Sequence, residues 1–424
     1  MLKLTLEKGR SFERQAEAAG KFLAKLLEEA VREGWIRIYA YPRPDSVITA
    51  AALYAAAASA GARPIVGVSI DPPRRIDVPT VLIGYGSLDY GTVDVDAPLA
   101  AFAPEIRSSP PPNSIYVDGD SSNPGLLGAA LIQVGGLYFR RDVLGLVLAG
   151  IHYGGKMDKV GKVYGVDSLV VSSILESRVL GEIKVLTSLK AYKPTEYSTC
   201  RSIGVTVNPY YPGLTGYPEE CAHLLAAAGL ERLASKRLEE LDDDDLKSLV
   251  RTVVAAIQDT AGVEVDVKDY IGGFMVSRAG KPSDYRMLAD ALVYSMEWSR
   301  SIEPLLAAAS GYDDEIPILE RLLEWGAPRM AKAVEEARPV RLRAIPWLRA
   351  YVVGSDLPQL FLRRALRVAG KLEEEAVIVY EDEGRYIVSA FQIEEALGYG
   401  QLKRLKNAKA VEGDGIFLKV RGRS

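Results

Sequence analysis

Short apolar runs alternate with helical stretches near the start of the chain, and this alternation constrains the fold more than any other feature. Residues Ser11–Gly34 carry apolar side chains at helical spacing, and residues 47–60 read as an alanine-rich helix. The predicted strands are 35–40, 64–70, 80–84 and 114–118. Apolar strands that alternate with helices are typical of a parallel α/β sheet.

The loops that follow these strands are where we expect the functional site. In open parallel sheets the chemistry lies beyond the carboxyl ends of the strands, because loops from several strands meet there. Three loops qualify here, residues 41–45, 84–87 and 118–120. They hold aspartates, an arginine, two tyrosines and glycines.

The rest of the chain divides into two further regions by its pattern. Residues 140–330 read as mostly helical, with Asp242–Asp245 as a capped helix start that suits the helix dipole. From about residue 338 strands return: 340–353, 376–380, 386–391 and 416–420, with a helix over 357–370. We therefore expect an α/β region over 1–230, a helical connecting region over 231–335 and a small α/β region over 336–424.

Composition excludes several classes of protein. Hydrophobic residues make up 48% of the 424 residues, yet the most apolar window, 143–151, is too short to span a bilayer. The first residues lack a signal-peptide core, so we expect a cytoplasmic protein. Two cysteines cannot build a disulfide framework or a Cys-x-x-Cys zinc site. The two histidines, His152 and His223, leave little room for histidine-based catalysis and favour packing or surface roles.

The net charge of −4 disfavours a protein that coats nucleic acid along its whole surface. Local basic stretches remain. The tail contains Lys403, Arg404 and Lys406, which form a solvated surface or, alternatively, contact nucleic acid or a partner. A second stretch contains four arginines between Arg338 and Arg349.

The three loops resemble the motifs of the DHH/RecJ phosphoesterase superfamily in damaged form. In that superfamily His-x-Asp-x-Asp, a second Asp, Asp-His-His and a fourth Asp hold two metal ions that activate water. Here the first motif reads Tyr41-Pro42-Arg43-Pro44-Asp45, the second has Gly84 in place of Asp, and the third reads Asp118-Gly119-Asp120 without histidines. The fourth lies near Gly154 and also lacks its Asp.

Later segments resemble the same superfamily. Residues 189–194 and 208–216 are similar to the linker after the catalytic domain of archaeal RecJ-like proteins. The C-terminal region resembles the DHH-associated domain, whose Ser-x-Arg and Gly-Gly-Gly-His segments hold nucleic acid. Here these read Ser389-Ala390-Phe391 and Gly413-Asp414-Gly415-Ile416, and Ser389 is the remaining candidate contact.

The resemblance implies a parallel-sheet DHH-like domain, a helical middle region and a small α/β DHH-associated domain. Among members, the pattern is similar to archaeal RecJ-like proteins that bind GINS and accompany the MCM helicase in DNA replication. Their eukaryotic counterpart is the inactive RecJ-derived subunit of the CMG helicase. The expected partners are therefore the GINS complex, the MCM helicase and, weakly, single-stranded DNA. The retained or altered motif positions are Tyr41, Arg43, Asp45, Gly84, Asp118, Gly119, Asp120 and Gly154.

The losses predict that the chain has no metal, no cofactor and no catalytic activity. Two metal ions need several carboxylates, and Arg43 places a permanent positive charge where a cation would bind. We expect Arg43 to pair with Asp45 or Asp118; a phosphate contact is the other reading, and Asp45 also suits a helix N-cap. Two alternatives stay open: a divergent single-strand exonuclease or phosphodiesterase with ligands from outside the motifs, and a standalone single-stranded DNA-binding protein.

Overall fold

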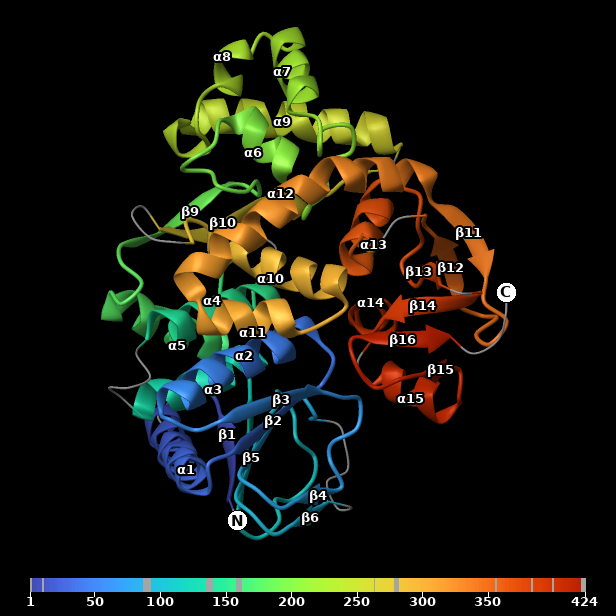
Figure 1. Cartoon of the computed structure of the whole chain (residues 1–424). Helices are drawn as coiled ribbons and strands as arrows, with labels where there is room; N and C mark the ends of the chain where they lie inside the picture. The colour runs from blue at the N-terminus through green and yellow to red at the C-terminus, as the bar shows by residue number, and fades with distance from the viewer. Residues whose placement is uncertain are drawn as a thin grey trace.

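The structure is a computed structural model of the chain (Figure 1). It describes residues 2–9, 11–86, 93–134, 140–157, 162–262, 264–277, 282–354, 357–382, 384–398 and 400–420. In the predicted loop 84–87, Ser87 lies outside these ranges. Within them, none of the helices is both long and apolar enough to cross a membrane.

A six-stranded parallel sheet forms the first layer, with strand order β1-β8-β7-β5-β2-β3. Its strands are β1 (Leu2–Leu6), β2 (Ile36–Ala40), β3 (Pro64–Val68), β5 (Thr80–Ile83), β7 (Leu99–Phe102) and β8 (Ser114–Gly119). All four predicted strands are present, and the parallel α/β fold is confirmed. The sequence patterns did not identify β1 or β7.

Helices pack on one face of this sheet (Figure 1). They are α1 (Phe12–Glu33), α2 (Pro44–Ser59) and α3 (Asn123–Val134), and α4 (Arg141–Gly154) and α5 (Gly165–Ser177) pack on these helices in turn. The predicted first helix is correct, because the apolar stripe of α1 is buried and Gly34 ends it at a positive φ of 84°. A short parallel pair, β4 (Arg75–Ile76) and β6 (Asp94–Val95), lies below the sheet in Figure 1.

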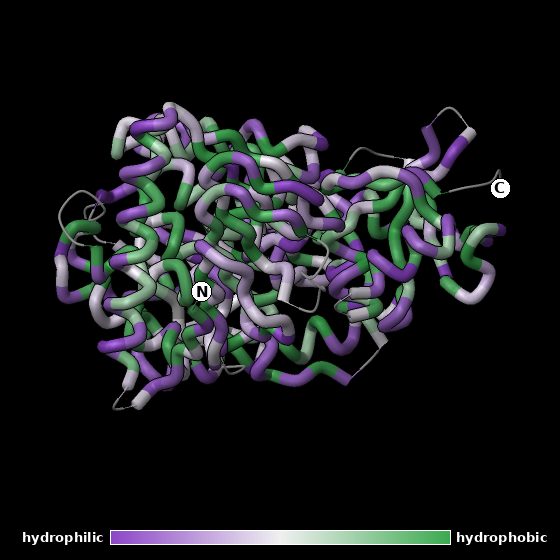
Figure 2. Tube along the Cα trace, turned by 90° about the horizontal axis from the view of Figure 1, so that it is seen from below, coloured by the Kyte–Doolittle hydropathy of each residue, from purple (hydrophilic) through white to green (hydrophobic). Residues whose placement is uncertain are grey.

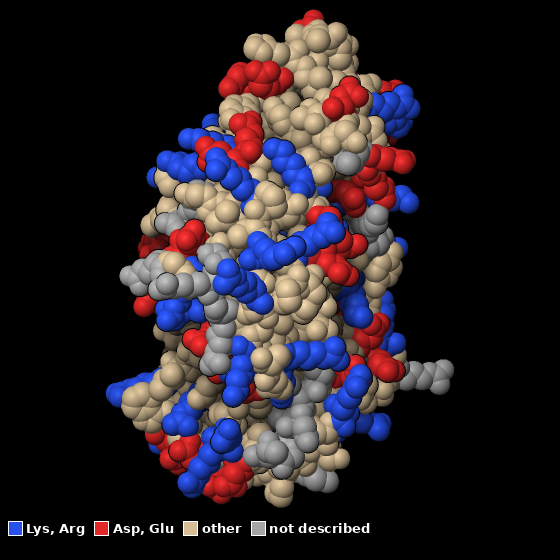
Figure 3. Space-filling model, turned by 90° about the vertical axis from the view of Figure 1, so that its right-hand side faces the viewer, with Lys and Arg blue, Asp and Glu red and all other residues tan. Residues whose placement is uncertain are grey.

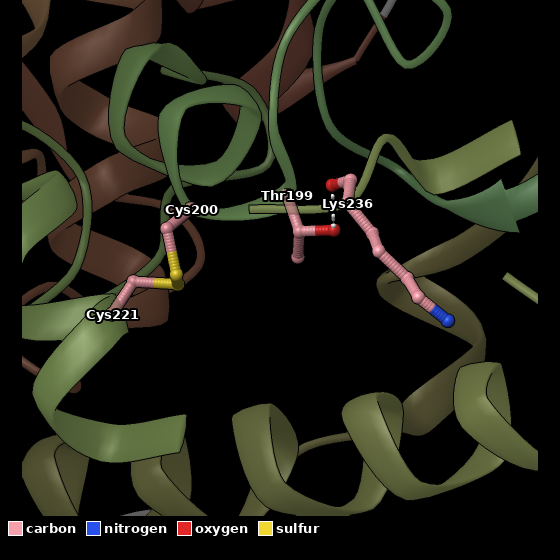
Figure 4. The surroundings of a disulfide bond; sticks show 4 residues. All are labelled: Thr199, Cys200, Cys221 and Lys236. Atoms are coloured by element: carbon pink, nitrogen blue, oxygen red, sulfur yellow. Dashed lines mark hydrogen bonds between the residues drawn. A yellow bond between two sulfur atoms is a disulfide. The ribbon is translucent and has the colours of Figure 1, made fainter. Parts of the chain in front are cut away.

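The middle region contains a strand pair that the helical prediction missed. Strands β9 (Ile183–Leu189) and β10 (Ile271–Ser277) form an antiparallel pair from segments far apart in sequence. Beyond it lie α6 (Thr199–Val205), α7 (Pro218–Ala227), α8 (Glu231–Ala234) and α9 (Asp243–Ala261), with short 3-10 turns at Leu238–Glu240 and Val267–Asp269. The predicted cap of α9 is confirmed, since Asp242 accepts hydrogen bonds from the amides of Asp244 and Asp245. A disulfide joins Cys200 of α6 to Cys221 of α7 (Figure 4).

Three helices connect this region to the rest of the molecule. They are α10 (Tyr285–Ser299), α11 (Glu303–Ser310) and α12 (Tyr312–Glu336). Helix α10 packs on α4, and α11 packs on α2, so both share a hydrophobic core with the first sheet. The helices α6–α9 have a separate core. Figure 2 shows hydrophobic segments running through the interior of the molecule. The boundaries proposed at 230 and 335 stay a prediction.

The C-terminal region is a second six-stranded sheet, with order β11-β12-β13-β14-β16-β15. Its strands are β11 (Arg338–Arg341), β12 (Arg349–Val352), β13 (Val377–Asp382), β14 (Arg385–Ser389), β15 (Val411–Glu412) and β16 (Phe417–Val420). Its helices are α13 (Gln359–Val368), α14 (Ala390–Leu397) and α15 (Gln401–Asn407).

Two expectations for this sheet were wrong. The segment 340–353 is not one strand, because β11 and β12 form an antiparallel hairpin around residues 342–348. The predicted strand 386–391 stops at Ser389, where α14 begins, because the chain turns there to cover the sheet.

Candidate functional site

The first loop places Arg43 and Asp45 at the start of α2. The helix begins at Pro44, where the fixed φ of proline suits the first helical position, and Arg43 is its extended N-cap residue. The prediction that Asp45 is the N-cap is therefore wrong. It lies inside the first turn, where a carboxylate interacts favourably with the helix dipole.

Asp45 is buried and receives donors from two elements. The Nε atom of Arg43 lies 3.3 Å from Oδ1 of Asp45, and Asn123 at the start of α3 donates to its Oδ2 at 2.8 Å. The side chain of Asp45 is 4% exposed and that of Arg43 is 33% exposed. The predicted pairing of Arg43 with Asp45 is present. Sequence reasoning missed Asn123, which follows the third motif.

Asp118 lies elsewhere, so the alternative pairing with Arg43 is wrong. Strands β7 and β5 separate its strand, β8, from β2 and the loop that holds Arg43. Its carboxylate accepts a hydrogen bond from Thr5 Oγ1 at 2.7 Å and lies 3.1 Å from Lys3 Nζ. Both partners belong to β1, the strand that the sequence did not reveal.

The remaining residues of the third motif make other contacts than the Arg43–Asp45 pair. The carboxylate of Asp120 is exposed and lies 3.3 Å from Lys156 Nζ. Gly119 has a φ of 150°, and a Cβ at this position would lie 1.9 Å from the carbonyl oxygen of Leu6. A side chain larger than hydrogen is excluded there by the neighbouring strand.

Gly84 and Gly154 stand at two positions where the superfamily motifs carry aspartate, and neither has room for it. A Cβ on Gly154 would lie 2.4 Å from the Cβ of Asp45. A Cβ on Gly84 would lie 2.3 Å from the hydroxyl of Ser46, and the φ of 84° favours glycine. Both glycines therefore border the first loop. The surrounding atoms leave no room for a carboxylate side chain at either position.

Tyr41, at the histidine position of the first motif, reaches across to the C-terminal region. Its hydroxyl donates to Glu394 Oε1 on α14 at 2.8 Å, and the backbone amide of Leu402 donates to the same oxygen at 3.3 Å. Burial raises the pKa of Glu394. This contact joins residues 353 positions apart in the sequence, and no local pattern marks Glu394.

A cavity of about 260 Å³ lies between the first helix layer and the C-terminal region. Its charged lining residues are Arg43, Asp45, Arg364, Glu394 and Glu395. Arg364 Nη2 lies 2.5 Å from Glu395 Oε2, so arginine and carboxylate are paired here as they are at Arg43 and Asp45. Both arginines that line the cavity are therefore paired with carboxylates of the same lining. Within the described residues, the structure holds no group of three or more His, Cys, Asp or Glu side chains placed to bind a metal ion.

The four candidate nucleic-acid contacts in the C-terminal region lie in three different settings. Ser389 is fully buried and its hydroxyl donates to Glu297, so it is out of reach of a ligand in this conformation. Lys403 and Lys406 of α15 lie 3.6 and 3.1 Å from the carboxylate of Asp71, which follows β3. These lysines therefore hold the two sheets together. Arg404 is exposed.

Neither histidine lines the cavity between the first helix layer and the C-terminal region. Burial, together with the nearby charges of Arg286 and Lys190, lowers the pKa of His152 to about 3. It is therefore neutral at physiological pH. The side chain of His223 is 76% exposed on α7.

Comparisons with known proteins identify the fold of the chain. No protein-family model and no curated protein sequence matches the chain. The crystal structure of CDC45 from Entamoeba histolytica matches with a TM-score of 0.56 and 10% identity, covering 96% of each chain. The chain has a CDC45-like fold. The predicted fold class, a parallel-sheet α/β region, a helical middle region and a small C-terminal α/β region, is confirmed, and at this level of identity the likeness describes the fold alone.

Two further solved structures resemble the chain less than CDC45 does. The exonuclease RecJ bound to manganese matches with a TM-score of 0.38 and 13% identity, over 96% of this chain and 89% of that one. The DHH domain of a member of a ribosomal-protein family matches with a TM-score of 0.31 and 11% identity, over 98% and 89%. Both likenesses are too distant to describe the geometry of this chain.

Proposed function

We propose that this chain is a catalytically inactive RecJ-like scaffold of the archaeal replicative helicase complex, which binds GINS and assists MCM at the replication fork. The observation that carries the proposal is the Arg43–Asp45 pair at the position of the superfamily's first metal motif. The CDC45-like fold supports the same reading.

A two-metal phosphoesterase mechanism requires carboxylates that converge on the cations. Here Asp45 is already bound by Arg43 and Asn123, and Asp118 faces Lys3 and Thr5 near the other edge of the sheet. The guanidinium of Arg43 stays charged at any physiological pH and repels a divalent ion. The alternative of a divergent exonuclease or phosphodiesterase would need ligands from outside the four motifs.

The partner surface that we favour is the edge formed by β3. The sheet order ends at β3, whereas β5, the other strand considered from the sequence, is internal. Ile65 on β3 is 49% exposed, and Trp35, which precedes β2, is 46% exposed, with Arg63 over its ring. An edge of this kind lets a partner strand extend the sheet through main-chain hydrogen bonds, while exposed side chains provide specificity. An uncovered apolar edge would also favour aggregation.

The test is size-exclusion chromatography with light scattering on the chain mixed with GINS from the same organism. We expect a complex at micromolar concentration, and we expect Ile65→Lys to abolish it because a charged side chain at an edge disfavours strand pairing. The matched control is Val185→Lys. Val185 is 64% exposed on β9 of the other strand pair, so this variant should still bind.

Separate elution of the unmodified proteins in both low and moderate salt would argue against the scaffold and would favour the standalone single-stranded DNA-binding alternative. Loss of the complex in both lysine variants would instead contradict the assignment of the interface to β3.

A further inference from the structure

The hairpin of β11 and β12 exposes an unusual combination of side chains. Residues 338–352 contain four arginines, one tryptophan and no acidic residue. Arg338, Arg341, Arg343 and Trp347 are all exposed, and Trp347, at 62%, is the most exposed tryptophan among the described residues. Strand β11 is also the edge of the C-terminal sheet.

The hairpin is anchored, so these side chains face outward from a fixed support. Leu342, Ile345 and Leu348 are at most 3% exposed and belong to the core beneath the sheet. The buried residues alternate with the exposed arginines and Trp347 along the turn. A cluster that projects from buried neighbours keeps its arrangement when a ligand approaches, which lowers the entropy cost of binding.

The positive charge of the hairpin is only partly neutralised. Arg349 pairs with Glu373, whereas the structure records no acidic partner for Arg338, Arg341 or Arg343 among the described residues. Arg341 lies opposite Arg349 in the strand register, so two like charges are neighbours on one face. Figure 3 looks at the side on which β11 lies in Figure 1, and lysines and arginines gather across the middle of that face. Such a site favours a ligand with repeated negative charge.

We propose that the β11–β12 hairpin is a docking site for single-stranded nucleic acid. The arginines would contact successive phosphates, and the indole of Trp347 would stack on an unpaired base. Proteins that bind single-stranded nucleic acid commonly combine cationic side chains with exposed aromatic rings. Every base has a flat face that can stack on a ring, and every nucleotide carries a negatively charged phosphate. A duplex would satisfy the arginines but leave Trp347 without a base to stack on. This proposal does not depend on the binding of GINS.

The experiment measures anisotropy of a labelled oligothymidylate with the full chain across a salt series. For Arg341→Ala/Arg343→Ala we expect weaker binding and a salt slope reduced by about 1.4, since each contact to a single-strand phosphate contributes about 0.7. For Trp347→Ala we expect roughly 5- to 100-fold weaker binding with an unchanged slope, and Trp347→Phe should recover part of the loss. The matched control is Arg14→Ala/Lys25→Ala, which removes two exposed charges from α1 and should bind as the unmodified chain does.

Circular dichroism melts of each variant separate a binding defect from a folding defect. The proposal would be overturned if the unmodified chain did not bind the oligonucleotide, or if the hairpin and α1 variants lost affinity equally. Equal competition by polyglutamate, tighter binding to vesicles of anionic lipid, or duplex binding that ignores Trp347 would each contradict a single-strand site.

Discussion

Asp45 is a buried carboxylate that is contacted by Arg43 and by Asn123. A buried carboxylate needs a compensating positive charge or several hydrogen-bond donors, since isolated burial of a charge is very unfavourable. Arg43 and the amide of Asn123 supply both. The pair thus stabilises the loop that leads into α2.

Replacing Arg43 should therefore destabilise the fold through Asp45. We expect Arg43→Ala to lower the free energy of unfolding by about 1–3 kcal/mol, between the values for exposed and for buried pairs. In a double-mutant cycle with Asp45→Asn, chemical denaturation should show that the effect of Arg43→Ala largely disappears. Arg37→Ala serves as the control, because Arg37 and Asp77 form an exposed pair whose loss should cost under about 1 kcal/mol. Strictly additive effects in the cycle would rule out the pairing.

Glu297 is a buried carboxyl whose protonation couples to stability. It lies on α10, is 1% exposed, and accepts hydrogen bonds from the hydroxyl of Ser389 and the amide of Leu360. Burial raises the pKa of Glu297 to about 7. The folded protein therefore holds this proton more tightly than the unfolded chain does, and the stability from this group is present at low pH and lost as the pH rises through 7.

We expect Glu297→Gln to remove this pH dependence. The amide can accept from Leu360 and donate to Ser389, so it mimics the protonated acid. Between pH 5 and 8 the unmodified protein should lose about 2–3 kcal/mol more than the variant does. Glu13→Gln, an exposed carboxyl on α1, is the control and should keep the original profile. Parallel profiles for Glu297→Gln and the unmodified protein, measured by thermal melts, would contradict a proton held at Glu297.

Residue identity alone could predict part of this site. Arg43 and Asp45 are two residues apart, so their pairing follows from local geometry, and the pairing was predicted. Glu394 could not be predicted, because its contact with Tyr41 depends on how α14 docks against the first sheet. The alternative pairing of Arg43 with Asp118 was wrong for a similar reason, because the partners of Asp118, Lys3 and Thr5, lie on β1, a strand that the sequence analysis did not identify.

At the scale of elements, the disulfide between α6 and α7 is the feature that the sequence patterns did not suggest. Cys200 is 5% exposed and Cys221 is fully buried, within a helical unit that has its own small core (Figure 4). Their sequence separation is 21 residues. A crosslink limits the freedom of the unfolded chain, which matters most where a core is small.

Cys200→Ala/Cys221→Ala should lower the free energy of unfolding of this helical unit by about 3 kcal/mol, as expected for a loop of this length. Denaturant titrations with and without reductant provide the measurement. Reductant should bring the unmodified protein to the stability of the variant and leave the variant unchanged. Detection of two free thiols in the denatured, unreduced protein would show that the bond does not form.

The elements that were predicted correctly share a strong local pattern. Helix α1 has a buried stripe at regular spacing and a glycine at its end, and the four predicted strands are mostly apolar runs. The elements that were missed lack such signals. Strand β7 is the short run Leu99–Phe102, and β9 is half exposed, so its identity as a strand depends on its pairing with β10.

At the scale of the molecule, the two sheets are joined by polar contacts as well as by a shared core. Asp71, after β3, faces Lys403 and Lys406, and the amide of Ile70 donates to Asp414 at 2.7 Å. Lys406 also lies 2.9 Å from Asp414. The loop next to the β3 edge is therefore anchored to the C-terminal region, which leaves β3 on a fixed support for a partner.

We propose that this arrangement does not support metal-dependent phosphoester cleavage. The direct measurement is digestion of labelled single-stranded DNA and RNA with Mn²⁺ or Mg²⁺ present, using the unmodified chain, Asp45→Ala and Asp118→Ala. We predict no cleavage above the background common to all three proteins, because the carboxylates are engaged by Arg43, Asn123, Lys3 and Thr5. Metal-dependent cleavage by the unmodified chain that either substitution abolishes would contradict the account, since it would demonstrate a working site at these residues.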